Sequence, residues 1–267
     1  MSVQPILMLR ALVLTLLGLS AGRAQAMAAE DGDCNDGETV IETDRPDVTN
    51  SSLVVPRSSV QVENGINWTT RQGGTSIDGS NTRVRFGVAS CTEILLDLPN
   101  YFHAMRGPAS AGFSDLSPAI KRQLGHSPGD IEWSATVGLT LPTGTTRIAG
   151  SGFGAYAQFP WSKEMGDGWG LSGMFTAFLM PGAGANNPTL EPTFAIERQM
   201  GSRADLFVEY VADHPRRGIS SQIVDSGGAF RITPTQQIDV RAGVGLNRAA
   251  PDHLFGLGYS LRFDHVL

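Results

Sequence analysis

Most of the chain alternates apolar and polar residues in segments of about ten, separated by clusters of Gly, Pro, Asn and Asp. The clearest segment spans 131–141, where the odd positions from Ile131 to Leu141 are apolar and the even positions are polar or glycine. A period of two predicts a β-strand with one apolar face. We predict about twelve strands, in the ranges 58–71, 82–90, 92–98, 114–124, 131–141, 153–161, 169–179, 190–198, 203–211, 222–232, 236–246 and 254–263.

The lengths of these segments and of their connections favour a barrel that crosses a membrane. About ten residues suffice for a tilted strand to cross a bilayer, whereas strands of soluble proteins are usually shorter. Long predicted connections at 72–81, 99–113, 142–152, 180–189, 212–221 and 247–253 alternate with short ones at 90–91, 125–130, 163–168, 199–202 and 233–235. Short periplasmic turns and longer outer loops are typical of outer-membrane barrels. We therefore expect an all-β, transmembrane, antiparallel up-and-down β-barrel rather than a soluble sandwich or barrel, with both chain ends periplasmic.

Aromatic residues gather near the ends of the predicted strands. The expected orientation puts Trp133, Trp161 and Trp169 at the periplasmic rim, and Trp68 and Tyr210 near the outer rim. Aromatic girdles at both membrane interfaces are typical of membrane proteins. The alternative is that these aromatic residues simply favour strand ends.

Charged residues lie opposite the apolar stripe in most predicted strands. If the apolar face meets lipid, the charged face lines the lumen. The predicted lumen-lining residues are Arg83, Arg85, Glu132, Glu191, Glu197, Asp205, Glu209, Asp225, Arg231, Asp239, Arg241 and Arg262. Unpaired charge is costly in a narrow lumen, so we expect opposite charges to pair or to meet water. Two interpretations stay open, namely a salt-bridge lattice that fills the lumen and a lining that selects permeants by charge and size.

The first residues have the pattern of a secretory signal peptide. Arg10 precedes an apolar run at 11–19, and Ala24-Gln25-Ala26 forms a small-x-small cleavage site. This pattern predicts a signal peptide at 1–26, an N-terminal segment at 27–56 and the barrel at 57–267. The exported compartment permits a disulfide between Cys34 and Cys91, but the sequence leaves two unpaired thiols equally open.

The composition excludes several other classes of protein. The chain has 32 Gly in 267 residues and only 17% charged residues, which disfavours both a disordered chain and a helical bundle. A net charge of −6 gives no basic surface for nucleic acid. The sequence has no Gly-x-Ser-x-Gly nucleophile motif, and its scattered histidines lack metal-ligand spacing. We therefore predict no catalytic residue, no metal site and no cofactor.

Several stretches resemble one family of outer-membrane proteins. They are Ile41 to Thr49, Asp115-Leu116 with Lys121, Leu139 to Gly144, Phe207 to Tyr210, Gln237 to Asn247, Pro251-Asp252, and Gly256 to Phe263. The family is labelled "putative meta-pathway of phenol degradation", and its members are often called simply transporters. The resemblance covers nearly the whole chain after residue 26. It implies a small outer-membrane barrel that transports hydrophobic or aromatic compounds.

The motif Asp44-Arg45-Pro46-Asp47 lies outside every predicted strand. Because Pro46 fixes its own φ and cannot donate to a β-ladder, the motif indicates an ordered loop. One hypothesis is that residues 41–56 fold into the lumen as a plug, with Arg45 and Asp47 pairing with lumen charges. The alternative is a solvated periplasmic tail.

The sequence thus predicts a channel or transporter for small, hydrophobic or aromatic compounds in the bacterial outer membrane. The expected partners are outer-membrane lipid, the barrel assembly machinery and a small-molecule permeant. Two other functions stay open, because a hydrolase can assemble Ser and His from different strands and a barrel can act structurally or in adhesion through its outer loops.

Overall fold

The computed structural model describes residues 34, 40–106, 111–149, 152–179 and 188–266. The predicted signal peptide at 1–26 lies outside the described residues. No helix in the described ranges is long and apolar enough to cross a membrane.

The described chain folds almost entirely into β-strands. They are β1 (Val60–Arg71), β2 (Gly74–Ala89), β3 (Thr92–Asp97), β4 (Tyr101–Arg106), β5 (Ala111–Phe113), β6 (Ser117–Ser127), β7 (Ile131–Thr140), β8 (Gly154–Gly166), β9 (Trp169–Leu179), β10 (Thr189–Met200), β11 (Ala204–Pro215), β12 (Ser221–Thr233), β13 (Gln236–Gly245) and β14 (His253–Phe263). One short helix, α2 (Thr146–Ala149), follows β7.

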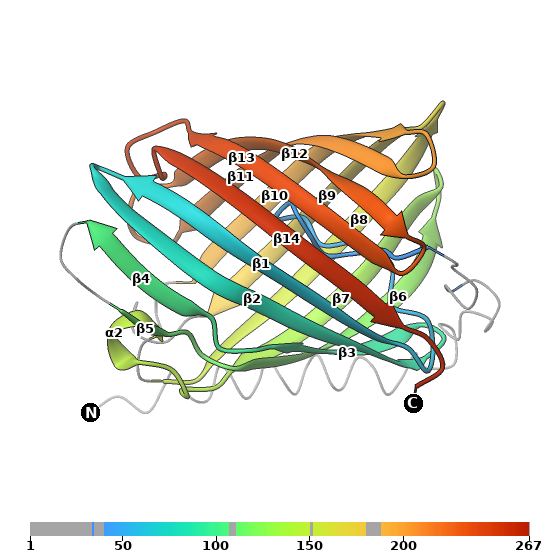
Figure 1. Ribbon diagram of the computed structural model, residues 1–267, viewed down its shortest axis with the longest axis horizontal. Helices are drawn as coiled ribbons and strands as arrows, with labels where there is room; N and C mark the ends of the chain where they lie inside the picture. The colour runs from blue at the N-terminus through green and yellow to red at the C-terminus, as the bar shows by residue number, and fades with distance from the viewer. Residues whose placement is uncertain (1–33, 35–39, 107–110, 150–151, 180–187, 267) are drawn as a thin grey trace. The chain divides into compact units, whose positions relative to one another are not determined.

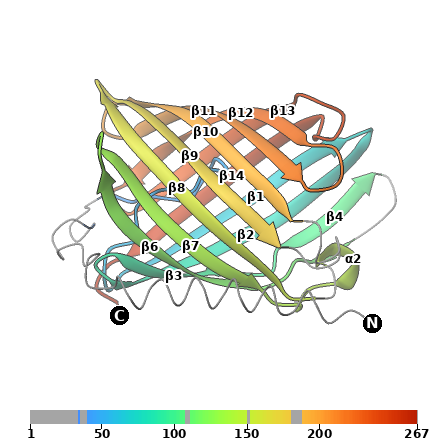
Figure 2. The ribbon, with the colours of Figure 1, turned by 180° about the vertical axis from the view of Figure 1, so that it is seen from behind.

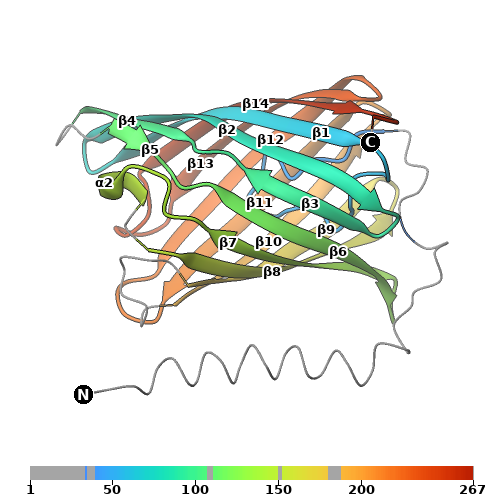
Figure 3. The same cartoon turned by 90° about the horizontal axis from the view of Figure 1, so that it is seen from below.

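The strands form one antiparallel sheet that closes on itself (Figures 1 and 2). From β6 to β14 each strand pairs with the next, and β14 pairs with β1, with Val60 opposite Phe263. β3 and β4 follow one another along β2, and they pair on their other side with β6 and β5 (Figure 3). These two interrupted wall strands bring the closed barrel to 12 strands, so the predicted fold is confirmed.

The barrel is polar inside and apolar outside. In β7, Val137 is 58% exposed, whereas its neighbour Thr136 is 1% exposed. The same alternation recurs around the wall, where buried side chains such as Gln61, Lys121 and Ser260 are polar and the large exposed ones are apolar. An outward apolar band around a polar interior is the arrangement of a transmembrane barrel.

Short and long connections separate to the two ends of the barrel, but two predicted loops are wrong. The range 72–81 was expected to be an outer loop, yet only Gln72 and Gly73 turn, both with positive φ, and β2 begins at Gly74. The range 99–113 contains β4 and β5. The range 72–81 is polar and rich in Gly and Ser, so it lacks the apolar stripe that marks a strand inside a membrane, and Pro and Gly interrupt the alternation in 99–113. Backbone pairing with β1 and β2 nevertheless extends the wall there.

The two cysteines form a disulfide, which decides the question that the sequence leaves open. Cys34 and Cys91 are bonded with their Cα atoms 5.2 Å apart. Cys91 lies in the short turn between β2 and β3, so the bridge ties the chain before residue 40 to this end of the barrel.

Candidate functional site

Residues 40–56, called the N-terminal segment below, run inside the barrel wall (Figure 1). The segment begins at the end with the short turns, where the Ile41 amide donates a hydrogen bond to the Pro234 carbonyl at 2.7 Å. It returns to the same end, where the Ser58 amide donates to the Gly87 carbonyl at 2.8 Å. The segment contains no helix or strand, so its backbone groups need partners from the wall.

Asp44 lies at the centre of a buried group of charges. Its carboxylate is 3.0 Å from Arg83 Nη1, 3.4 Å from Lys121 Nζ and 3.5 Å from Arg85 Nη1. Its amide donates to both carboxylate oxygens of Glu63, at 3.2 and 3.1 Å. Burial by itself raises the pKa of Asp44, but the charges of Arg85, Lys121 and Arg83 outweigh it and hold that pKa well below its ordinary value.

The cations around Asp44 are also paired within the wall. Arg83 Nε lies 2.6 Å from an Asp97 carboxylate oxygen, and Arg85 Nη2 lies 2.9 Å from Glu93. Lys121 Nζ is 3.5 Å from the same Glu93. Because every charge in this cluster has an opposite partner, the cluster meets the condition under which burial of ions is tolerated.

Arg45 and Pro46 bind β13, which is separated from β1 by β14 in the wall. Arg45 Nη2 lies 3.3 Å from Asp239 Oδ1 on β13. Arg241, two residues further along that strand, donates from Nη1 to the Pro46 carbonyl at 3.2 Å. Three consecutive residues of the N-terminal segment therefore contact four strands, β1, β2, β6 and β13.

Residues 47–49 lie against acidic side chains of β10 and β11. Glu209 accepts hydrogen bonds from the amides of Val48 and Thr49, each at 2.8 Å, and from the Thr49 hydroxyl at 2.6 Å. The Thr49 hydroxyl also contacts that of Thr193. The pKa of Asp47 is raised well above its ordinary value, by burial and then by the neighbouring charges of Glu209 and Glu197.

The second half of the N-terminal segment contacts β8 and β3. Asn50 Nδ2 donates to Gln158 Oε1 at 3.1 Å, and the Ser52 and Ser162 hydroxyls are 2.7 Å apart. The Val55 amide donates to Glu93 at 2.7 Å. With the contacts above and the bond from Arg262 to the Val40 carbonyl, the segment is bound to nine strands: β1, β2, β3, β6, β8, β10, β11, β13 and β14.

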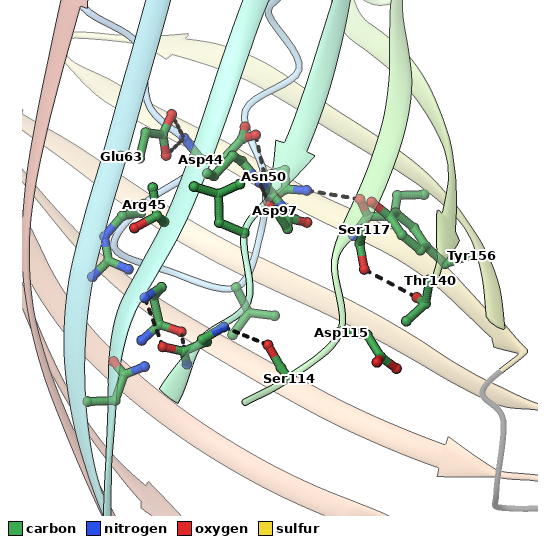
Figure 4. A pocket seen from close by; sticks show the side chains of 18 of the residues that line it. Asp44, Arg45, Asn50, Glu63, Asp97, Ser114, Asp115, Ser117, Thr140 and Tyr156 are labelled. Carbon is green, nitrogen blue, oxygen red and sulfur yellow. Dashed lines mark hydrogen bonds and ion pairs between the residues drawn. The ribbon is translucent and has the colours of Figure 1, made fainter. Parts of the chain in front are cut away.

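A cavity of about 790 Å³ lies between the N-terminal segment and the end of the barrel with the long loops. Residues 44–48 and Asn50 line one side, and Arg147 to Ala149 of α2 line another. In Figure 4, Asp44 and Arg45 face this space from the segment, while Thr140 and Tyr156 face it from the wall. The apolar and aromatic lining residues include Leu98, Phe102, Ile148, Tyr156, Met174 and Phe178. The polar ones include Asn67, Asn81, Arg83, Asp97, Asn100, Asp115, Ser117 and Gln158.

The twelve predicted lumen-lining residues all share the inward register of their strands, but only some contact the N-terminal segment. Arg83, Arg85, Glu209, Asp239, Arg241 and Arg262 bond to it. Glu191 lines the cavity. The others pair within the wall: Glu132 with Gln123, Glu197 with Ser172, Asp205 with Arg231, and Asp225 with Arg241 at 3.7 Å.

Four charged wall residues in the cluster around Asp44 are absent from the predicted lumen set. They are Glu63, Glu93, Asp97 and Lys121. Each shares the parity of the polar face of its strand, so the period-two rule applied to every strand would have found them. Within the described residues, no group of three or more His, Cys, Asp or Glu side chains is suited to hold a metal ion.

Three of the predicted girdle residues lie at the end with the short turns. The rings of Trp133 and Trp161 are 6.3 Å apart, and Arg198 lies 4.9 Å over the ring of Trp169, next to the β8–β9 turn. Trp68 packs 5.8 Å from Phe255 near the other end.

The rim position of Tyr210 stays a prediction, because the strand extends further than the sequence pattern indicates. β11 continues to Pro215, so Tyr210 lies five residues before its end rather than next to a loop. The polar residues after 211 again hide the extension of the strand from the sequence pattern.

Residues 43–263 match the family described as "Putative MetA-pathway of phenol degradation". The chain belongs to this family. The family match begins at Thr43, so it includes Asp44, Arg45 and Asp47 of the N-terminal segment as well as the barrel wall. No curated protein matches the chain.

Solved structures with the same fold are outer-membrane barrels of low sequence identity. The COG4313 outer membrane channel from Pseudomonas putida F1 has 13% identity and a TM-score of 0.63, and the match covers 83% of this chain and 100% of that one. The KdgM porin in complex with disordered oligogalacturonate has 8% identity and a TM-score of 0.53, covering 77% and 99%. The translocator domain of autotransporter NalP from Neisseria meningitidis has 11% identity and a TM-score of 0.50, covering 78% and 90%. These similarities show the fold of this family member.

Proposed function

We propose that this MetA-pathway family member is an outer-membrane channel for small, largely apolar or aromatic compounds, and that its N-terminal segment closes the lumen. The observation that carries the proposal is the cavity of about 790 Å³ between this segment and the long-loop end of the barrel. In this function the protein binds and passes a solute and carries out no chemical step.

The contacts of the N-terminal segment support closure. A loop bound to nine of the strands lies across the path between the two ends of the barrel. Its attachments are mainly hydrogen bonds and ion pairs to wall side chains, and polar contacts of this kind can be exchanged for water when the loop leaves. We therefore propose a closed resting state and an open state in which the segment has moved.

The lining of the cavity supports the proposed class of permeant. Its volume is in the range of pockets that hold small organic ligands. Phe102, Tyr156 and Phe178 offer aromatic surfaces, with the rings of Tyr156 and Phe178 6.3 Å apart. Asn100, Ser117 and other polar groups supply hydrogen bonds at the edges. This combination suits a compact aromatic body that carries one or two polar substituents.

We place the protein in the bacterial outer membrane, reached by export with the signal peptide at 1–26. Its partners in this proposal are outer-membrane lipid around the apolar band, the barrel assembly machinery and the small-molecule permeant. The fold shared with outer-membrane barrels and the exposed apolar side chains support this location.

Solute flux and ionic current together test the proposed function. Purified protein in lipid vesicles should admit phenol faster than a sugar of similar size, and Phe178→Ala should reduce that preference. Single channels in a planar bilayer should show mostly closed traces with brief openings. A properly folded, heat-modifiable barrel that passes neither ions nor solutes under any variant described below would refute the channel.

A further inference from the structure

The guanidinium of Arg45 occupies space that two wall glycines leave free. A Cβ atom at Gly65 would lie 2.3 Å from Arg45 Nη2 and 2.4 Å from Cζ. A Cβ atom at Gly258 would lie 2.5 Å from Arg45 Nε and 2.5 Å from both carboxylate oxygens of Asp239. Gly65 and Gly258 are directly opposite each other in the β1–β14 pairing. The two glycines therefore form one continuous hollow in the inner wall.

Backbone conformation does not explain these glycines. Neither has the positive φ seen at turn glycines such as Gly73, so an L residue can adopt the same backbone at both positions. Glycine in a strand interior lacks a side chain to pack and weakens the strand. The close approach of Arg45 at both positions, and of Asp239 at Gly258, is thus the structural reason for glycine.

Asp239 completes the hollow as a site for a cation. Its side chain is fully buried, and that of Arg45 is 14% exposed. The two charges are 3.3 Å apart, and Arg241 on the same strand holds the next carbonyl of the N-terminal segment. A flat guanidinium fits a shallow hollow between two backbones, whereas an ammonium is a compact, strongly hydrated point charge.

We propose that Gly65, Gly258 and Asp239 form a guanidinium-binding site, called the Arg45 site below, that keeps the N-terminal segment in its closed position. This proposal rests on the proposed function, in which the segment closes the lumen. The proposal identifies the wall residues whose contacts keep the segment bound. Filling the hollow with methyl groups should therefore open the channel without touching the segment itself.

The test uses Gly65→Ala and Gly258→Ala, singly and together. Because the clashing atoms are the ends of flexible side chains, the barrel should still fold. Either substitution should displace Arg45, and Gly258→Ala should also shift the Asp239 carboxylate. Gly170→Ala is the matched control. Its Cβ would also lie on the inward face of a strand, but the nearest atom would be 3.7 Å away. Folding is checked by heat-modifiable migration for every variant.

Two readouts report release of the N-terminal segment. One is the open probability of single channels, and the other is maleimide labelling of Val55→Cys, since Val55 is only 2% exposed while the segment is bound. Loss of a charge-assisted contact should raise both by ~10-fold or more in the double glycine variant. Gly170→Ala should leave both unchanged. If the double glycine variant shows the open probability and the labelling of wild type, the proposed Arg45 site is wrong.

A double-mutant cycle separates the site from general damage to the wall. Arg45→Ala should raise opening and labelling by itself, but should add little in the Gly65→Ala/Gly258→Ala background, because the contact is already lost. Fully additive effects would contradict the proposal. If Arg45→Ala opens the channel and the glycine variants do not, the site fails while closure by the segment stands. If labelling rises and current does not, the site stands and the proposed function fails.

Discussion

Replacing Asp44 by Asn removes the charge at the centre of the closed state while keeping the shape of the side chain. The Asn oxygen can still accept the bond that the Ser51 amide now donates to Asp44 Oδ1 at 3.0 Å. What disappears is the attraction to Arg83, Lys121 and Arg85, all within 3.5 Å. The variant should therefore fold as a barrel and bind its N-terminal segment more weakly.

The structure allows an estimate of the size of this effect. Breaking a buried ion pair by removing one partner costs about 3–5 kcal/mol, and the lower value suits Asp44 because Arg83 and Arg85 keep their partners Asp97 and Glu93. About 3 kcal/mol multiplies the ratio of released to bound segment by ~150-fold. The lowered pKa of Asp44 means that the wild-type attraction persists at neutral pH and is lost only as acid protonates it.

Single-channel recording at neutral pH measures the effect directly. Asp44→Asn should open far more often than wild type, with the same conductance per opening, because the barrel itself is unchanged. Asp205→Asn is a suitable control, since Asp205 pairs with Arg231 on the inner wall rather than with the segment. An open probability of Asp44→Asn equal to that of wild type and of the control would refute this reasoning.

Four further predictions follow from particular residues. Because the raised pKa of Asp47 makes binding of the segment take up a proton, openings should become rarer as the pH is lowered from neutral, and Asp47→Asn should remove this dependence. Cys34→Ser should increase openings several-fold in recordings, because it frees the chain before the segment from Cys91. Phe178→Ala should weaken block of the current by an aromatic solute ~3- to 10-fold. Val137→Arg should destabilise the barrel in urea titrations by about 2–4 kcal/mol, whereas Val137→Leu should not.

The sequence is sufficient to predict the barrel because its period of two reports which face meets lipid. Val137 and Thr136 differ in exposure just as their alternation predicts. The alternation of apolar and polar residues ends where the strands extend beyond the apolar outer band of the barrel. The strand extensions at 74–81 and beyond Tyr210 could therefore not be predicted from this alternation. There the strands are held by backbone pairing, which leaves no trace in hydropathy.

The candidate site was only partly predictable. The motif around Asp44 stood out because Pro46 cannot belong to a strand, and the charged faces indicated which side chains meet the lumen. The partners of each charge depend on how far the strands are staggered around the barrel, and no single strand carries that information. The hollow at Gly65 and Gly258 is also invisible in the sequence, because these two glycines are far apart in the chain and adjacent only through closure of β14 on β1.

The central claim is that movement of the N-terminal segment opens the channel, and a reversible cross-link tests it most directly. Thr49 and Thr193 touch through their hydroxyls, so Cys at both positions can form a disulfide only while the segment is bound. In the Asp44→Asn background, oxidised Thr49→Cys/Thr193→Cys protein should show the low open probability of wild type. After reduction it should open as often as reduced Asp44→Asn protein without the added cysteines, a comparison that allows for reduction of the Cys34–Cys91 bridge. Frequent openings that persist in the fully cross-linked protein would contradict the account.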